Sequence, residues 1–318
     1  MEKSKTNKLF EKPIVKPFIF YSIFRAFYGT GILLITWLFT TNTEAPLWMS
    51  ILFLLCSMVF YRVLMKQIKT KDSLKLRLKL YKLKGDKYHC PICGFKSKDM
   101  FYIGENFPVL YQKDIIACGK RKAGCYKCNS TDKERLIYLF LINDFKIESK
   151  AKNIKLLHIA PEENLTKLFL KLNFEEYLCG DLFLEGYNYP NYVKNMNLLE
   201  LPLNDNIIDL VICNHVLEHI IDDKIAMREI YRILKPGGKA ILQVPISANT
   251  IETIEDYKIT SKSQREKHFG QHDHVRIYGQ DYVQKLNSIG FTTEVINIYE
   301  NYKNFAINPK ENIYLVTK

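Results

Sequence analysis

Apolar residues form two long runs near the start of the chain. Residues 18–39 contain a single charge, Arg25, and residues 47–61 contain none. A membrane-spanning helix needs about 20 mainly apolar residues. The pattern therefore predicts a two-helix transmembrane hairpin, with a buried helix pair in a soluble fold as the alternative. The second apolar run and the lack of a small-residue cleavage site count against a cleaved signal peptide.

A shorter pattern follows in residues 73–84, where apolar and basic residues alternate. A period of two is typical of a strand. The same residues could also lie flat on a membrane surface, with the apolar side chains inserted and the lysines against headgroups. The pattern alone leaves both interpretations open.

The second half of the chain alternates short apolar runs with helical patterns. Thr131 and Glu134 form a capping-box pair ahead of an apolar run, which predicts a helix start. Strands are expected at 155–159, 176–179, 208–213 and 240–244, and helices at 165–172 and 226–234. This alternation predicts an α/β fold with a doubly wound, Rossmann-like, mainly parallel sheet.

The charge distribution changes what the net charge of +12 means. Residues 1–87 hold 16 Lys/Arg against 5 Asp/Glu, and the remaining residues hold 30 against 29. The basic excess flanks the apolar runs, so the positive-inside rule predicts a multi-pass protein in the cytoplasmic membrane, with both termini in the cytoplasm. Little positive surplus is left for a nucleic-acid partner.

Four of the eight cysteines form two C-x-x-C pairs, Cys90 with Cys93 and Cys125 with Cys128. Four thiolates are typical of a closed, tetrahedral, structural zinc site. The chain is therefore divided into a membrane anchor (1–70), a basic segment with a four-cysteine zinc module (71–145) and a catalytic domain (146–318).

Polar residues mark the carboxyl ends of the first two expected strands, where doubly wound sheets bind ligands. The first strand is followed by Ala160, Pro161 and Glu162, and Asp181 ends the second strand 19 residues later. An acidic residue at this distance is typical of a ribose-binding position. The first turn lacks the glycines that bring a backbone close to a pyrophosphate, which counts against NAD or FAD.

Three blocks then carry a family resemblance. Residues 200–211 (ELPLNDNIIDLV), 216–219 (VLEH) and 228–239 (REIYRILKPGGK) match in order and spacing. Together they resemble class I S-adenosylmethionine-dependent methyltransferases of the methyltransferase type 11 family. Residues 269–282 are similar to a bacterial subgroup that also carries an N-terminal cysteine module.

The resemblance implies S-adenosylmethionine as cofactor and assigns residues to it. Asp181 and Leu182 would meet the ribose, and Asn197 and Leu198 the adenine. Glu162 or Glu163 would meet the cofactor's ammonium, although both also suit a helix N-terminus as dipole partners. The remaining positions are Ala160 and Pro161 in the first turn and Asn214 after the strand expected at 208–213.

Acceptor chemistry is expected at two places. His215 follows the fourth strand and should face the crevice, whereas Glu218 and His219 are expected to serve helix structure. His272, Asp273 and His274 are further candidates for a base that accepts the acceptor's proton. A metal site or a hydrogen-bonded packing loop are the alternatives for these three.

The sequence thus predicts a membrane-tethered methyltransferase with an unidentified acceptor: a glycan, a lipid-linked intermediate or a small molecule. One alternative is a methyltransferase-fold binding or scaffold protein without turnover. Another is a zinc-ribbon RNA methyltransferase.

Overall fold

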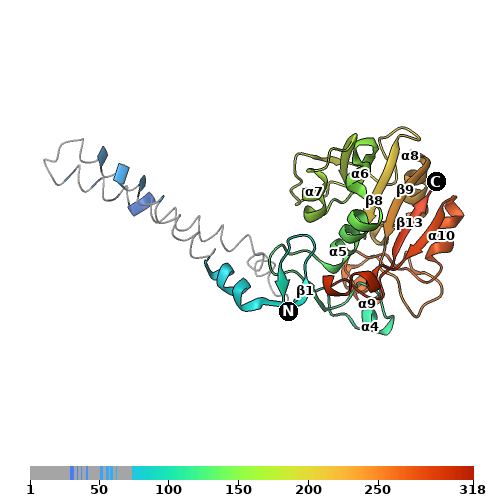
Figure 1. Ribbon diagram of the computed structural model, residues 1–318, viewed down its shortest axis with the longest axis horizontal. Helices are drawn as coiled ribbons and strands as arrows, with labels where there is room; N and C mark the ends of the chain where they lie inside the picture. The colour runs from blue at the N-terminus through green and yellow to red at the C-terminus, as the bar shows by residue number, and fades with distance from the viewer. Residues whose placement is uncertain are drawn as a thin grey trace. The chain divides into compact units, whose positions relative to one another are not determined.

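The structure, a computed structural model, describes residues 74–318 and, before them, residues 29–31, 34, 37, 41, 51, 52, 55, 56, 58, 59 and 62. The chain divides into two compact units, Met1–Lys79 and Leu80–Lys318. The second unit contains both the cysteine pairs and the large sheet (Figure 1).

Among the described residues, no helix is both long enough and apolar enough to cross a membrane. A span needs about 20 apolar residues in one helix, and the longest helix with described bounds, α8, has 11 residues. This finding contradicts the predicted multi-pass placement in the cytoplasmic membrane and gives no support to the transmembrane hairpin. Most of the two predicted spans, residues 18–39 and 47–61, lie outside the described residues.

The strand interpretation of the alternating segment, residues 73–84, is also corrected. Residues 74–83 are helical, and the first strand begins only at Lys84. The alternation does not impose a strand here because Leu, Lys and Arg are good helix formers.

The cysteine pairs lie in a small β-rich module at the start of the second unit. Two antiparallel pairs build it, β1 with β2 and β3 with β4. Its elements are β1 (Lys84–His89), β2 (Lys96–Ser97), β3 (Phe101–Ile103), α4 (Pro108–Gln112) and β4 (Arg121–Gly124).

The module leads into helices that cover one face of the sheet. These are α5 (Asp132–Leu139), the π-helical turn η1 (Phe140–Asp144), α6 (Ile147–Lys150) and the 3-10 turn η2 (Ala151–Asn153). Thr131 accepts the backbone N–H of Glu134, and Glu134 accepts that of Thr131. The predicted capping box is therefore confirmed.

Seven strands form the large sheet, in the order β12-β13-β9-β8-β5-β6-β7. The parallel part consists of β5 (Lys155–Ile159), β6 (Glu176–Asp181), β7 (Val193–Asn195), β8 (Ile208–Asn214) and β9 (Leu234–Gln243). Counted from β5, its order is 3-2-1-4-5, as in doubly wound nucleotide-binding folds. The predicted fold class is thus confirmed for this domain.

The connections and the far edge complete the domain. Between the parallel strands lie α7 (Glu163–Phe169), the 3-10 turn η3 (Leu217–His219) and α8 (Asp223–Ile233). After β9 come β10 (Ile254–Glu255), α9 (Lys262–Phe269), β11 (Arg276–Ile277), α10 (Tyr282–Ile289), β12 (Thr292–Ile296), the 3-10 turns η4 (Tyr299–Asn301) and η5 (Lys303–Phe305), and β13 (Ile313–Thr317). β12 and β13 are antiparallel to their neighbours.

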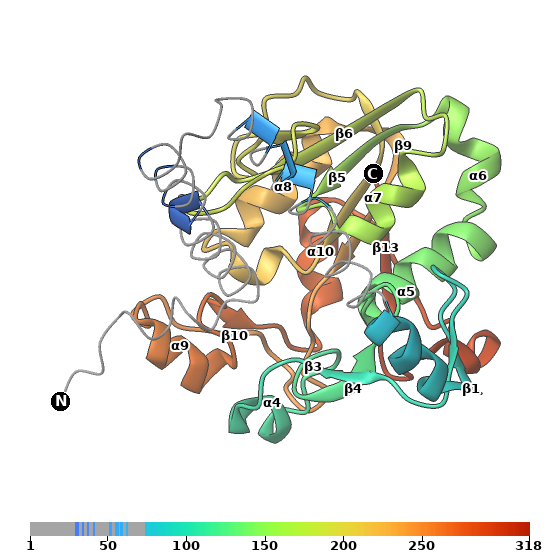
Figure 2. The ribbon, with the colours of Figure 1, turned by 90° about the vertical axis from the view of Figure 1, so that its left-hand side faces the viewer.

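Each face of the sheet has its own apolar core. Leu157 of β5 packs with Met227 of α8 and Leu286 of α10 on one face. Leu156 of β5 packs with Leu136 of α5 and Phe169 of α7 on the other. Figure 2 shows α8 and α10 on one side of the strands and α5 and α7 on the opposite side. Successive residues of β5 thus point into opposite cores, as the pleat of a strand requires.

Candidate functional site

The switch point of the sheet lies between β5 and β8, because the chain leaves β5 toward β6 and later returns to β8 on the other side. Ala160 follows the last residue of β5, and its φ of 47° is left-handed. Its N–H donates to the carbonyl of Gly180, which ties the turn to the end of β6. A non-glycine residue therefore adopts the conformation that glycine takes most readily.

Glu162 bridges the two strands at the switch point. Its Oε2 lies 2.7 Å from Nε2 of His158, and its Oε1 accepts a hydrogen bond from Nδ2 of Asn214. His158 is fully buried, and Nδ1 of its ring lies 3.1 Å from the hydroxyl of Tyr177. Glu163, in contrast, is exposed and pairs with Lys167. The structure therefore places Glu162, and not Glu163, in the crevice.

The side-chain oxygen of Asn214, Oδ1, is a buried hydrogen-bond acceptor. The residue is 8% exposed, and no described residue donates a hydrogen bond to its Oδ1. Buried polar atoms are nearly always paired, so the Oδ1 of Asn214 is a candidate contact for a ligand. Glu162 and Asn214 together present hydrogen-bond acceptors at the switch point.

Asp181 ends the neighbouring strand β6 on the same edge of the sheet. Partial burial raises the pKa of its carboxyl above the ordinary value. Gly180 before it is required by packing, because a Cβ there would lie 2.6 Å from the sulfur of Met196. Leu182 after it is exposed, as expected for a residue at the mouth of a crevice.

The loop after β7 carries the predicted adenine-side residues. Oδ1 of Asn197 accepts the backbone N–H of Leu199 at 3.0 Å, which shapes a local turn. Leu198 is buried in the core, and Asn197 is exposed. Since a carbonyl oxygen has two lone pairs and the amide keeps its N–H groups, Asn197 retains donors and an acceptor for a ligand.

A cluster of charged and imidazole side chains follows β8. His215, with a φ of 57°, has its Nδ1 3.0 Å from Nζ of Lys133 and 3.2 Å from Oε1 of Glu218. Its Nε2 lies 3.5 Å from Oε1 of Glu311. The predicted catalytic residue His215 is therefore surrounded by three ionisable partners, of which Lys133 and Glu311 come from distant parts of the chain.

Glu218, His219, Asp273 and His274 continue this cluster. Nδ1 of His219 lies 3.4 Å from Oδ2 of Asp273, and the rings of His219 and His274 meet edge to face at 4.8 Å. Burial alone would raise the pKa of the Glu218 carboxyl, but the hydrogen bond to His215 and the nearby imidazoles lower it to about 2. Burial lowers the pKa of His274 to about 4.

A cavity of about 140 Å³ opens beside this cluster. The cysteine module and the segment after α9 line it together, and its polar lining includes Cys118, Arg121, Lys133, Gln271 and His274. His272 has a half-exposed side chain and is absent from the described lining. Of the three predicted residues in this segment, the structure thus brings Asp273 and His274, but not His272, into the cluster.

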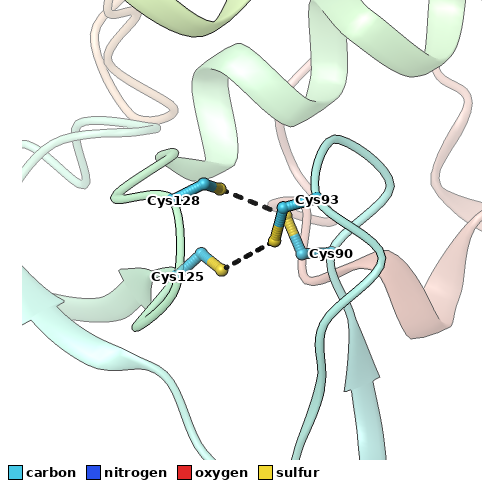
Figure 3. Close-up of side chains that lie close together, drawn as sticks. All are labelled: Cys90, Cys93, Cys125 and Cys128. Atoms are coloured by element: carbon cyan, nitrogen blue, oxygen red, sulfur yellow. Dashed lines mark hydrogen bonds between the residues drawn. The ribbon is translucent and has the colours of Figure 1, made fainter. Parts of the chain in front are cut away.

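The four predicted metal ligands converge (Figure 3). The sulfurs of Cys90 and Cys128 are 3.7 Å apart, as are those of Cys93 and Cys125. Sulfurs at about 2.3 Å from one tetrahedral zinc would be about 3.8 Å apart. The spacing fits a four-thiolate zinc site and is far too long for disulfides.

Two matching turns hold these cysteines. Gly94 donates to the carbonyl of Cys90 and Asn129 to that of Cys125, both at 2.9 Å. Both residues have positive φ, 69° for Gly94 and 60° for Asn129. Asn and Asp are the non-glycine residues that adopt this conformation most readily. The second turn therefore repeats the first without its glycine.

Several site residues escaped the sequence analysis. Lys133, Glu218 and Glu311 reach the cluster from α5, from η3 and from the loop before β13, and no local pattern links them. Arg276 is fully buried and donates to the carbonyls of Leu217 and Ile221. Arg276 lies within residues 269–282, the segment with the subgroup resemblance, and in the structure it holds the η3 turn.

Part of the sheet domain is similar in sequence to known proteins. Residues 175–242 match the family model described as a methyltransferase domain. Over 75 residues the chain is 45% identical to an uncharacterized protein of Methanocaldococcus jannaschii, covering 23% of this chain and 33% of that protein. Over 58 residues it is 38% identical to a probable S-adenosylmethionine-dependent methyltransferase of Mycolicibacterium smegmatis, covering 18% of this chain and 23% of that protein.

A similar solved structure is an S-adenosylmethionine-dependent methyltransferase from Mesorhizobium loti, with 13% identity and a TM-score of 0.38. The match covers 53% of this chain and 93% of that one. The chain spans a third or less of the length of the two curated relatives above. The family model and these relatives support a class I, S-adenosylmethionine-dependent methyltransferase domain in this part of the chain, and an enzyme.

Proposed function

We propose that the whole chain transfers a methyl group from S-adenosylmethionine bound at the switch point of the sheet. The observation that carries this proposal is the pair of acceptors formed by Glu162 and the unpaired Oδ1 of Asn214. The methionine part of the cofactor carries an ammonium, which needs such acceptors. A carboxylate bound to a cationic donor forms one of the stronger hydrogen bonds in proteins.

The other predicted cofactor residues fit the same placement. Asp181 would accept the ribose hydroxyls from the end of β6, beside Leu182. Asn197 and Leu198 would flank the adenine from the loop after β7. Ala160 and Pro161 form a turn without a phosphate-binding glycine loop, which suits a cofactor that contains no phosphate.

Bound S-adenosylmethionine supplies an electrophilic methyl group. His215 stands directly after Asn214, so we place it next to the acceptor atom, where it would accept the acceptor's proton. Lys133 and Glu218 hold its Nδ1 side. Of the other predicted catalytic residues, Asp273 and His274 would shape the acceptor's surroundings.

The cavity at Lys133 and His274 is the proposed acceptor pocket. At about 140 Å³ it is smaller than the usual 300–1,000 Å³ of small-molecule sites. It would therefore accept a small molecule or the end of a larger acceptor, such as one sugar of a glycan or lipid-linked intermediate. Lys133 favours an acceptor that carries an anionic or hydroxyl group, whereas Arg121 of the same lining is paired with Asp132 and Glu105 adds a negative charge.

We further propose that Cys90, Cys93, Cys125 and Cys128 hold a structural zinc ion. The support is the sulfur spacing and the closed set of four thiolates, which leaves no position for substrate. Zinc would fix the module against α5, which begins three residues after Cys128 with its cap at Thr131.

Titration calorimetry with S-adenosylmethionine tests the cofactor site. We expect the wild-type chain to bind it and Glu162→Gln to bind it about 10–100-fold more weakly, because a charge-assisted hydrogen bond contributes about 1.5–3 kcal/mol. Asp181→Ala should weaken binding as well.

Glu163→Gln is the matched control, since this neighbouring carboxylate is exposed. It should bind like the wild type. A wild-type chain that takes up no S-adenosylmethionine at millimolar concentration would refute the enzyme and favour a scaffold. Equal loss in the Glu162 and Glu163 variants would refute the assignment of Glu162.

A further inference from the structure

Three potential metal ligands meet outside the proposed cofactor site. Glu218 and His219 come from the turn η3, and His274 comes from the segment between α9 and β11. One ligand atom of each lies within 4.8 Å of the others. Two ligands of one tetrahedral ion, each at about 2.1 Å, are about 3.4 Å apart. Binding of one ion would therefore draw the three side chains together from this wider spacing.

The carboxylate of this set has a free oxygen. Glu218 is 1% exposed, and its Oε1 is bound by Nδ1 of His215. Its Oε2 has no hydrogen-bond partner among the described residues. A fully buried carboxylate oxygen without a donor is costly, and coordination of a cation is one of the few ways to compensate it.

The surroundings orient one of the imidazoles as in known metal sites. Nδ1 of His219 faces Oδ2 of Asp273 at 3.4 Å. Histidine ligands usually donate their second ring N–H to a carboxylate in this way, which fixes the ring and makes the ligand nitrogen more basic. Asp273 would therefore orient His219 without touching the ion.

The fold also brings the two segments together firmly. The N–H of Val275 donates to the carbonyl of Glu218 at 3.0 Å. The fully buried guanidinium of Arg276 donates to the carbonyls of Leu217 and Ile221 on either side of the turn. The ligand positions are thus held by backbone contacts that do not depend on an ion.

We propose that Glu218, His219 and His274 bind a divalent transition-metal ion such as Zn²⁺. Two imidazole nitrogens and one carboxylate oxygen are a ligand set of catalytic zinc sites, which keep a fourth position open. His274 also lines the 140 Å³ cavity, so an ion held by these three residues would lie beside the proposed acceptor pocket.

The ion's role for the acceptor rests on the proposed function, whereas its binding does not. An acceptor hydroxyl at the open position would lose its proton more easily, since bound zinc lowers the pKa of a water ligand to about 7. His215 lies beside Glu218, within reach of a proton released there.

Cobalt and zinc loading of the metal-stripped full-length chain tests the site. We expect two equivalents of Zn²⁺ after dialysis, one in the four-cysteine site and one here. Glu218→Gln and His274→Ala should each retain only one. With Co²⁺, both variants should keep the strong thiolate-to-cobalt absorption, which shows that the cysteine module is intact.

His268→Ala is the matched control, because His268 is an exposed histidine in the last turn of α9. It should retain two equivalents. Asp273→Asn should bind the second ion about 10–100-fold more weakly, as is typical for residues that orient a ligand.

Two outcomes would overturn the proposal. One is a folded wild-type chain that binds a single equivalent, entirely accounted for by thiolate absorption. The other is unchanged stoichiometry in both Glu218→Gln and His274→Ala. Calorimetry with S-adenosylmethionine on the same samples reports the cofactor site separately, so failure of one proposal is distinguishable from failure of the other.

Discussion

At the scale of single residues, the first turn shows how the switch point is formed without glycine. Ala160 takes a left-handed conformation that costs an L-residue roughly 1–2 kcal/mol. Its N–H bond to Gly180 and its packing against the core hold it there. The turn that looks degenerate in sequence is therefore equivalent in backbone conformation to one with glycine.

This conformation makes a prediction for stability. Ala160→Val should destabilise the protein by about 1–3 kcal/mol, because a β-branched residue fits a positive φ poorly. Ala160→Gly should stay within about 1 kcal/mol of the wild type, since relief of strain offsets the greater entropy of glycine in the unfolded chain. Urea unfolding measures both.

Ala248→Val serves as the comparison, because Ala248 is exposed and is not among the residues with positive φ. Its effect should stay within about 0.5 kcal/mol. Equal effects of valine at both positions would contradict the conformational argument.

At the scale of elements, two local predictions had different outcomes. The capping box of α5 formed as predicted, because all its atoms lie within four residues. The helix expected at 226–234 and the strand expected at 240–244 leave Pro236-Gly237-Gly238 as a turn between them. Instead α8 ends at Ile233, and the turn interrupts the register of β9, where Ile208 pairs with Leu234 but Leu210 pairs with Lys239.

The η3 turn depends on a single buried side chain. Arg276 donates to carbonyls of this turn and to Glu255. Arg276→Met should destabilise the protein by about 3–5 kcal/mol, because it leaves Glu255 and these carbonyls without their donor. Chemical denaturation measures the change.

Arg265→Met is the matched change, since the side chain of this partly exposed arginine donates a long hydrogen bond, 3.3 Å, to the carbonyl of Ile259. We expect a loss below about 1 kcal/mol. A small effect at Arg276 would show that the turn is held by other contacts.

At the scale of the whole molecule, the cysteine module and the sheet domain belong to one compact unit. Arg135 of α5 connects them, because its guanidinium donates to the carbonyls of Ala123 and Ser130 in the module and of Phe305 and Ala306 near the C-terminus. Metal bound at the four cysteines should therefore stabilise the sheet domain as well as the cysteine module.

The corresponding prediction concerns zinc and melting. These measurements use a Glu218→Gln background, so that an ion at the second proposed site does not contribute. Adding Zn²⁺ at 1,000 times the Kd of the thiolate site to this metal-stripped protein should stabilise the fold by about 4 kcal/mol and raise Tm. Cys125→Ser should lose this response. Cys56→Ser should keep it, because Cys56 lies outside the module and is exposed. A zinc-dependent rise in Tm that survives in Cys125→Ser would contradict the thiolate site.

The sequence by itself determined the features that are local. Hydrophobic periodicity located β5, β6, β8 and α8, and the cysteine spacing located four side chains that converge in the structure. Periodicity failed at residues 74–83, where apolar alternation and helix propensity conflict and the structure is helical.

Only the tertiary structure decided which distant residues share a site. Glu162 and Asn214 are 52 positions apart, and Lys133 and His215 are 82 apart. Such pairs arise from strand order and packing, which bring together the carboxyl ends of β5 and β8 and the start of α5. Sequence spacing carries no record of these contacts, and so Glu218, expected to be structural, emerged as the centre of the cluster.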